Sequence, residues 1–416
     1  MTRHALMVRG AAALALLGAV AGCNNDKKDV LTAPVPAGGK LVQSYVALGN
    51  SITAGYQSGG IDDSTQMESY AYLLAQQMGT RFAIPALADP GCPPPIDNFL
   101  TGHRVGNGTS STCAYRDPAS ITPVINNVAV PGATSLDPTA ASTSASNILT
   151  TLFLGGQTQV QKALEAQPTF ATIWIGNNDV LPAALSGFLV PVKGVSPGMT
   201  SVTTFTKNYA TMMSQLMQGA PALKGVLIGV VNVTGAPALF PVQQLIDSAG
   251  FKLQFDVAAT GVPGGVTIDS TCVNRPTSLV YVGIIQAMQA GAYPTTLYCK
   301  LSSNATLAKK GVGESYVLDP TEQAAVSSTV QAYNAYIAAK ADSLGWAYFD
   351  PNSALTLLRA MGAIPAHPNL ADATNPFGTY ISLDGIHPRL PAHKLIASTL
   401  IGIINGKYNT KLNPVP

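Results

Sequence analysis

The sequence predicts an α/β protein in which helices cover both faces of a mostly parallel β-sheet. The segments TFATIWI (169–175) and GVLIGVV (225–231) are continuously apolar, which is typical of strands buried on both faces. Segments with apolar residues at helical spacing alternate with such strands, as at 70–78 and 205–217. This alternation predicts a parallel sheet, and such sheets bind ligands at the carboxyl ends of their strands.

The other elements follow along the chain. The apolar run Tyr45–Leu48, which ends at Gly49, is expected to be the first strand. Further strands are expected at 124–130 and 346–350, helices at 160–164, 319–344 and 395–403, and a polar loop at 57–66. The helix at 319–344 has the clearest start. Asp319 is expected to cap it, Pro320 to be its first helical residue, and Glu322 to complete a capping box with Asp319.

Two segments interrupt the alternation. Residues 85–122 are rich in proline and predict an irregular excursion. Residues 238–318 are too long to be structureless within a compact domain, so we expect an inserted subdomain or lid there.

Each of these segments carries two cysteines. Their grouping along the chain favours the disulfides Cys92–Cys113 and Cys272–Cys299, while the other pairings and four buried free thiols remain alternatives. None of the four lies in a spacing that suggests zinc.

The first 40 residues are expected to lie outside the fold. Residues 1–22 combine two arginines with an apolar run too short to span a membrane stably, which is typical of a secretory signal. The sequence VAGC (20–23) resembles the lipobox of bacterial lipoproteins, which implies that Cys23 is acylated and anchors the chain in a membrane. The two asparagines that follow imply the outer membrane, and 23–40 reads as a tether. A secretory peptide with an incidental cysteine is the alternative.

The charge balance argues against a polyanionic partner such as nucleic acid. Residues 1–22 hold two of the 23 Lys and Arg residues and none of the 21 acidic residues, which leaves 21 of each sign in the mature chain.

A serine with glycines on both sides follows the first strand. In GNSITAG (49–55), Ser51 would be presented at a strand's carboxyl end, although helix capping alone would explain such a serine. A nucleophilic serine needs a base and a carboxylate that orients the base. His387 is the histidine in the most suggestive context, because Asp384 precedes it by three residues in SLDGIHP.

Two further residues could stabilise a developing oxyanion. Gly132 follows the segment NNVAVP, where its backbone amide is unobstructed by a side chain. Asn178 follows TFATIWI and could donate its side-chain amide to the same oxyanion. Each residue alone would be explained by turn formation, but together these signals indicate one site.

The four segments resemble, in order, those of the SGNH/GDSL family of serine hydrolases: GNSITAG (49–55), NNVAVPGA (126–133), IGNND (175–179) and DGIHP (384–388). The resemblance implies a three-layer α/β/α sandwich with a flavodoxin-like sheet over about 41–410. It also implies Ser51 as nucleophile, His387 as base, Asp384 as its partner, and an oxyanion hole formed by Ser51, Gly132 and Asn178. Asn50 stands where the family usually has aspartate, from which we expect altered loop polarity but not lost catalysis.

The resemblance implies cleavage of carboxylic esters through an acyl-enzyme, without a metal or organic cofactor. Lipid or other acyl esters suit the predicted membrane tether and the apolar composition. Deacetylation of a surface polysaccharide fits the same site. A surface lipoprotein that binds glycan or lipid without catalysis is the alternative from another class.

Overall fold

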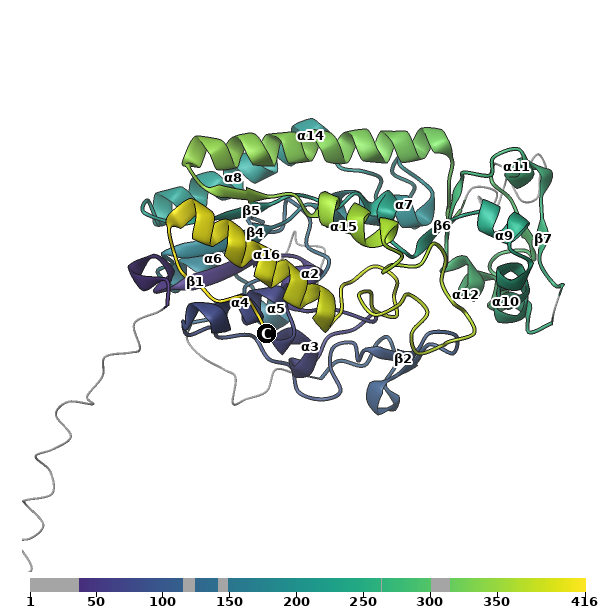
Figure 1. Cartoon of the computed structure of the whole chain (residues 1–416), viewed down its shortest axis with the longest axis horizontal. Helices are drawn as coiled ribbons and strands as arrows, with labels where there is room; N and C mark the ends of the chain where they lie inside the picture. The colour runs from purple at the N-terminus through teal and green to yellow at the C-terminus, as the bar shows by residue number, and fades with distance from the viewer. Residues whose placement is uncertain (1–36, 115–123, 141–148, 263, 301–314) are drawn as a thin grey trace, which may run out of the picture.

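The computed structural model describes residues 37–114, 124–140, 149–262, 264–300 and 315–416 (Figure 1). The predicted signal peptide (1–22), the predicted acylation site Cys23 and the tether up to residue 36 lie outside the described residues. None of the described helices is both long and apolar enough to cross a membrane.

Four parallel strands form the central sheet in the order β1-β4-β5-β11. They are β1 (Tyr45–Gly49), β4 (Phe170–Trp174), β5 (Lys224–Ile228) and β11 (Ala347–Phe349). Every residue of β1 and β4 is buried, which explains why their sequences are apolar without alternation. The predicted fold class is confirmed.

Alternate side chains of each strand pack into opposite helical layers. Tyr45 and Ala47 of β1 share a hydrophobic cluster with helices α4 and α16. Val46 and Leu48 share another cluster with α6, α8 and α14. The sheet therefore lies between two helical layers (Figure 1). These five helices are α4 (Tyr70–Met78), α6 (Gln159–Glu165), α8 (Val202–Gly219), α14 (Pro320–Leu344) and α16 (Leu390–Tyr408).

The other helices are shorter. Outside residues 238–318 they are α2 (Ser51–Ala54), α3 (Asp63–Met67), α5 (Leu149–Leu154), α7 (Leu181–Ser186) and α15 (Pro351–Ala360), with the 3-10 turns η3 (Gly39–Val42), η4 (Val105–Asn107), η6 (Asn177–Asp179) and η7 (Val233–Gly235). The strands β2 (Ile96–Asn98) and β3 (His103–Arg104) form a small antiparallel pair within the proline-rich excursion. As expected, Asp319 and Glu322 form a capping box at the start of α14.

The expected strand at 124–130 is wrong as a regular element. One parallel bridge joins Asn127 to Ala47 beside β1, and the Val130 amide also donates to the Gly49 carbonyl at 3.2 Å, but no regular strand forms among the described residues 124–130. The segment runs beside β1, and two asparagine side chains add contacts with neighbouring backbone carbonyls. The Asn126 amide donates to the Tyr45 carbonyl (2.8 Å), and the Asn127 amide donates to the Thr53 carbonyl (2.9 Å).

The expected loop at 57–66 is also partly wrong, because α3 begins within it. Asp62 caps this helix by accepting a hydrogen bond from the Thr65 amide at 2.8 Å, and the Thr65 hydroxyl accepts one from the Asp62 amide. This capping box stabilises a helix whose few residues show no apolar periodicity.

The described residues of 238–318, which are 238–262, 264–300 and 315–318, form a structured addition at one end of the sheet (Figure 1). Within this described part, an antiparallel sheet in the order β10-β8-β6 and a parallel pair β7-β9 lie with four helices. Its hydrophobic cluster also includes residues from 364–381, so the addition packs against the chain that leads to Asp384. The elements are β6 (Leu239–Pro241), α9 (Gln243–Asp247), α10 (Ala249–Thr260), β7 (Thr267–Ile268), α11 (Ser270–Val273), β8 (Leu279–Tyr281), α12 (Ile284–Gln289), β9 (Thr296–Leu297) and β10 (Val317–Leu318).

Both predicted disulfides are present. Cys92 pairs with Cys113 across 21 residues, and Cys272 pairs with Cys299 across 27 residues. Each bond therefore closes a loop inside one of the two segments that interrupt the alternation of strands and helices.

Candidate active site

Ser51 lies at the turn between β1 and α2. Asn50 caps α2 by accepting a hydrogen bond from the Ile52 amide at 3.3 Å, and Ser51 is the first helical residue. A side chain at Gly49 would come within 2.7 Å of the Trp174 carbonyl oxygen, so only glycine allows this close approach of β1 and β4. The second amide atom of Asn50, Nδ2, has no partner among the described residues, and the position is fully buried.

Gln159 of α6 also holds the turn between β1 and α2, through hydrogen bonds to Gly49. Its side-chain oxygen accepts a hydrogen bond from the Gly49 amide at 2.9 Å, and its side-chain nitrogen donates to the Gly49 carbonyl at 3.0 Å. The buried carboxamide thus satisfies the Gly49 amide and shares the Gly49 carbonyl with the Val130 amide at the point where β1 ends. Sequence reasoning did not find Gln159, because nothing in the sequence indicates which strand end it reaches.

The segment DGIHP folds into a turn around the Asp384 carboxylate. Its Oδ1 accepts hydrogen bonds from the backbone amides of Ile386 and His387, both at 2.9 Å. Gly385 adopts φ +72°, a left-handed conformation that favours glycine. This Asx turn directs the imidazole of His387 back toward its own carboxylate.

Ser51, His387 and Asp384 form one continuous hydrogen-bonded chain. The Ser51 hydroxyl lies 2.8 Å from His387 Nε2, and His387 Nδ1 lies 2.8 Å from Asp384 Oδ2. The structure therefore brings together two segments that are 336 residues apart in sequence. The geometry is that of a hydroxyl, a base and an orienting carboxylate.

Two further contacts hold the Asp384 carboxylate. The Gly59 amide donates to Oδ2 at 2.8 Å, and the Ser382 hydroxyl donates to Oδ1 at 3.0 Å. Burial raises the pKa of Asp384, but the charge of His387 and the hydrogen bonds from His387 and Gly59 outweigh it and hold the pKa well below its ordinary value. Asp384 is therefore ionised at neutral pH, as a partner for imidazolium requires.

An aromatic ring covers the imidazole. The ring of Tyr56 meets that of His387 edge-on, with the centroids 5.0 Å apart. Burial and the nearby charge of Asp384 raise the pKa of Tyr56 to about 12, so its hydroxyl is neutral beside the site. Tyr56 is a second residue that sequence reasoning did not single out.

The two predicted oxyanion donors lie at the ends of neighbouring segments. Gly132 adopts φ +82° in the turn after 124–130, which again favours glycine. The side-chain amide of Asn178 donates one hydrogen bond to the Ala133 carbonyl at 2.9 Å, which orients the amide beside the Gly132 turn. Asn178 also lines the cavity that contains Ser51 and His387.

Asp179 joins the two segments that carry these donors. Its two carboxylate oxygens accept hydrogen bonds from the backbone amide and the hydroxyl of Ser135, both at 2.7 Å. Burial raises the pKa of Asp179 to about 6, although hydrogen bonds from Ser135 and Thr200 lower it. Sequence reasoning placed Asn178 in the site but missed the function of its neighbour.

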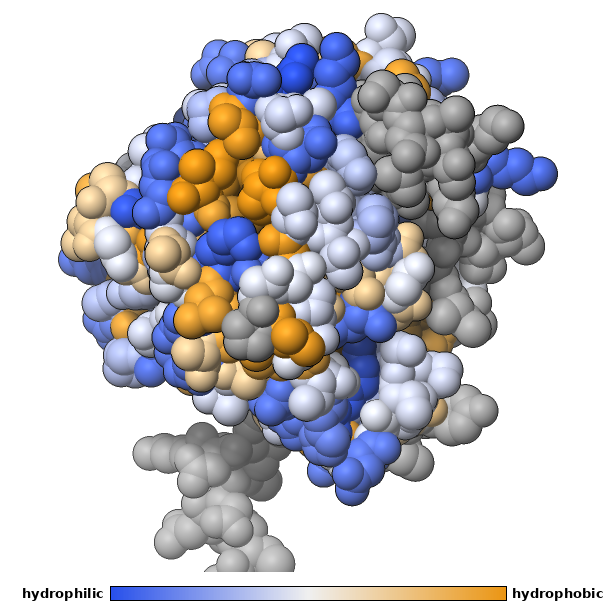
Figure 2. All heavy atoms as spheres, turned by 90° about the vertical axis from the view of Figure 1, so that its right-hand side faces the viewer, coloured by the Kyte–Doolittle hydropathy of each residue, from blue (hydrophilic) through white to orange (hydrophobic). Residues whose placement is uncertain are grey.

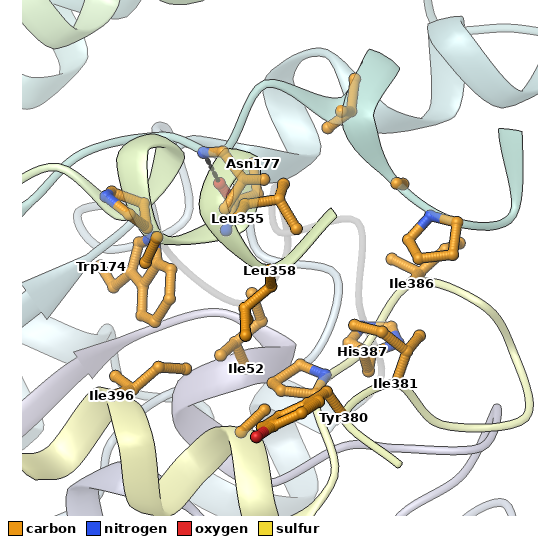
Figure 3. A pocket seen from close by; sticks show the side chains of 18 of the residues that line it. Ile52, Trp174, Asn177, Leu355, Leu358, Tyr380, Ile381, Ile386, His387 and Ile396 are labelled. Carbon is orange, nitrogen blue, oxygen red and sulfur yellow. Dashed lines mark hydrogen bonds between the residues drawn. The ribbon is translucent and has the colours of Figure 1, made fainter. Parts of the chain in front are cut away.

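A largely apolar cavity of about 130 Å³ opens beside Ser51 and His387. Figure 3 shows Leu355 and Leu358 of α15 between Trp174 and His387, with Ile52 nearby. The wall is completed mainly by apolar side chains from α16 and from residues 380–388. Such a wall suits a hydrocarbon group of about the size of benzene, which fills an engineered cavity of roughly 150 Å³.

No group of three or more His, Cys, Asp or Glu side chains that could hold a metal ion lies in the part of the chain that the structure describes.

These features define an α/β protein with a serine, histidine and aspartate array at the carboxyl edge of a parallel sheet. A sequence profile of the family described as GDSL-like Lipase/Acylhydrolase matches residues 45–400, and the chain belongs to this family. It is accordingly a carboxylic ester hydrolase, and the family resemblance seen in the sequence is confirmed. A search of curated proteins found no match.

Several solved structures are similar to the chain. They include a GDSL-like protein from Parabacteroides merdae (13% identity, 88% of this chain and 95% of that chain, TM-score 0.34). An acetylxylan esterase from Geobacillus stearothermophilus has 10% identity over 89% of this chain and 95% of its own, with a TM-score of 0.36. A phospholipase A1 from Streptomyces albidoflavus has 15% identity over 88% and 97%, with a TM-score of 0.32.

Proposed function

We propose that the chain cleaves carboxylic esters through an acyl-enzyme on Ser51. The hydrogen-bonded chain from Ser51 through His387 to Asp384, with both distances at 2.8 Å, is the observation that carries this proposal. His387 Nε2 takes the proton of Ser51 as the hydroxyl oxygen attacks the ester carbonyl. Asp384 holds the proton on Nδ1 and stabilises the imidazolium that forms.

The developing oxyanion is placed among three donors: the backbone amides of Ser51 and Gly132 and the side chain of Asn178. His387 then returns the proton to the leaving alcohol, which departs and leaves the acyl group on Ser51. A water molecule gives its proton to His387 and attacks the acyl carbonyl, and the same donors stabilise the second oxyanion. The carboxylic acid is released and Ser51 regains its proton.

We propose that the acyl group is apolar. The cavity beside Ser51 has an almost entirely apolar wall, which favours a hydrocarbon chain over a sugar. Polysaccharide O-deacetylation on the same site is the alternative. A series of soluble p-nitrophenyl esters of increasing acyl length, measured beside acetate release from an acetylated polysaccharide, separates the two.

The assignment of Ser51 is tested by Ser51→Ala. We expect the rate on p-nitrophenyl butyrate to fall by about 10⁴-fold or more, and a fluorophosphonate probe to label wild type but not the variant. Ser64→Ala is the matched control, because Ser64 is an exposed serine on α3. Wild-type rates in Ser51→Ala, with the fold intact by circular dichroism, would refute the proposal.

The cellular location is proposed from the sequence of residues 1–40. We propose an exported lipoprotein that is held at the outer membrane through acylated Cys23. Metabolic labelling with a radioactive fatty acid tests this, because Cys23→Ala should lose the label and leave the membrane fraction. Label retained in Cys23→Ala would place the lipid elsewhere or show adventitious labelling.

A further inference from the structure

Helix α15 lies over the cavity, yet it is scarcely buried. Of its 10 residues only Pro351 is buried. Its inner side chains Leu355 and Leu358 line the cavity beside Ser51 (Figure 3). Its outer side chain Leu357 is 59% exposed, and Met361 at its C-terminal end is 69% exposed. The helix therefore presents apolar side chains both to the cavity and to solvent.

Helix α16 also contributes an exposed apolar side chain beside the cavity. Leu395 lines the cavity and is 40% exposed, so it connects the interior of the cavity to the outside. We call Leu357, Met361 and Leu395 the mouth surface. In Figure 1, α15 and α16 lie on the same side of the molecule, facing the viewer.

The mouth surface lacks negative charge. Residues 351–364 and 390–399 contain no aspartate or glutamate, and the nearest acidic residue along α15 is its exposed N-cap Asp350, seven residues before Leu357. They contain two basic residues, Arg359 and Lys394, and the Arg359 guanidinium is turned inward to donate to the Gly235 carbonyl. A surface of this kind can approach lipid headgroups that are zwitterionic or anionic without repulsion.

We propose that the mouth surface docks on a lipid surface, from which the apolar ester enters the cavity. The inference rests on the proposed function for the identity of the substrate. An acyl chain that crossed water to reach the cavity would expose each methylene group, at about 0.8 kcal/mol per CH₂. Docking brings the lipid to Leu395, which is exposed and also lines the cavity, and the chain passes there from lipid to the apolar wall that includes Leu355 and Leu358. The exposed Leu357 and Met361 are buried by the lipid in this arrangement.

Vesicle binding tests the docking independently of catalysis. All proteins start at Asn24 and carry Ser51→Ala, so that neither acylation nor hydrolysis contributes, and no described residue is removed. Their binding to phosphatidylcholine vesicles with about one-fifth phosphatidylglycerol is measured by co-sedimentation. We expect Leu357→Gln and Met361→Gln each to lower the partition coefficient by about tenfold, because each removes an apolar side chain from the contact.

Leu253→Gln is the matched control. Leu253 is a leucine of similar exposure, 51%, on α10 of the addition formed by 238–318, and it does not line the cavity. That addition exposes several large apolar side chains, and Figure 2 shows apolar patches on the face that it forms. We expect its variant to bind vesicles like the parent. An equal loss of binding in Leu253→Gln and Leu357→Gln would overturn the proposal, as would unchanged binding in both mouth variants.

Hydrolysis separates failure of the docking from failure of the proposed function. With Ser51 intact, Leu357→Gln and Met361→Gln should keep wild-type rates on soluble p-nitrophenyl butyrate and lose about tenfold on the same chemistry presented in vesicles. Loss on both substrates would show that these residues act in the site rather than at a lipid surface, and would refute the docking. Absence of hydrolysis in the wild type would refute the proposed function instead, while leaving the vesicle result intact.

Discussion

The carboxylate of Asp179 accepts two hydrogen bonds from Ser135, one from its backbone amide and one from its hydroxyl, both at 2.7 Å. Asp179 follows Asn178 directly, and Ser135 lies three residues after Gly132. One buried carboxylate therefore links the two turns that carry the proposed oxyanion donors. The side chain of Asn208 also donates to the Ser135 hydroxyl, at 3.1 Å, which completes the support of this link.

Asp179→Asn is expected to lower kcat by about tenfold to a hundredfold with little change in KM. An asparagine amide can accept only one of the two hydrogen bonds and presents a donor to the other Ser135 donor. The two turns then separate slightly, and misplaced oxyanion donors reduce stabilisation of the transition state more than binding of the ester. Steady-state kinetics on soluble p-nitrophenyl butyrate measures both constants.

Ser135→Ala provides the graded comparison for Asp179→Asn. It removes the hydroxyl donor but keeps the backbone donor, so we expect a smaller loss of kcat. An unchanged kcat in Asp179→Asn, with the fold intact, would show that the link does not position the donors.

The stability contribution of Asp179 is expected to depend on pH. Because burial raises its pKa to about 6, the folded state takes up a proton between about pH 6 and pH 4 that the unfolded state binds only near its ordinary value of 3.8. The cost of burying the ionised carboxylate is therefore present above pH 6 and decreases as the pH falls. The contribution of Asp179 to stability therefore increases as the pH falls, whereas that of a salt-bridged carboxylate decreases.

Comparison with Asp179→Asn isolates the contribution of Asp179 to the pH dependence of stability, because the other groups titrate in both proteins. The free energy of unfolding of wild type minus that of the variant should increase by about 2 kcal/mol from pH 7 to about pH 4.5. Urea denaturation at a series of pH values measures it. A difference that stays constant with pH would show that the pKa of Asp179 is not raised.

Asp384→Asn is expected to reduce kcat by about 10³- to 10⁴-fold. Asparagine keeps the shape of the turn but lacks the charge that stabilises imidazolium, and its amide can favour the wrong tautomer of His387. Asp342→Asn, an exposed position on α14, should leave the rate unchanged. A loss of less than tenfold in Asp384→Asn would remove Asp384 from the proposed mechanism.

Leu355→Trp is expected to shorten the accepted acyl chain. The larger side chain occupies the cavity that Leu355 lines, so hydrolysis of an octanoyl ester should fall at least about tenfold while that of an acetyl ester changes by less than about threefold. Leu357→Trp places the same ring on the outer side of α15 and should preserve both soluble activities. Equal losses on the two esters in Leu355→Trp would show that the acyl group binds elsewhere.

The sequence alone predicted the fold class and the residues that we propose as the reacting groups. Apolar runs predicted β1, β4, β5 and β11, because strands buried on both faces are mostly apolar. Ser51, Gly132, Asn178, Asp384 and His387 were predicted from local patterns, since each depends on a turn whose geometry is encoded within a few neighbouring residues. The two disulfides followed from the order of the cysteines.

Only the tertiary structure decided how distant segments support these groups. The contact of Gln159 with Gly49 spans 110 residues, and that of Asp179 with Ser135 spans 44. Neither contact can be predicted from the neighbouring sequence, because the hydrogen-bond partner of the buried carboxamide or carboxylate lies in a distant segment of the chain. The side chains of Asn126 and Asn127 likewise donate to the backbone carbonyls of Tyr45 and Thr53, which lie far from them in sequence. The exposed apolar face of α15 likewise became interpretable only when its other face was found to line the cavity beside Ser51.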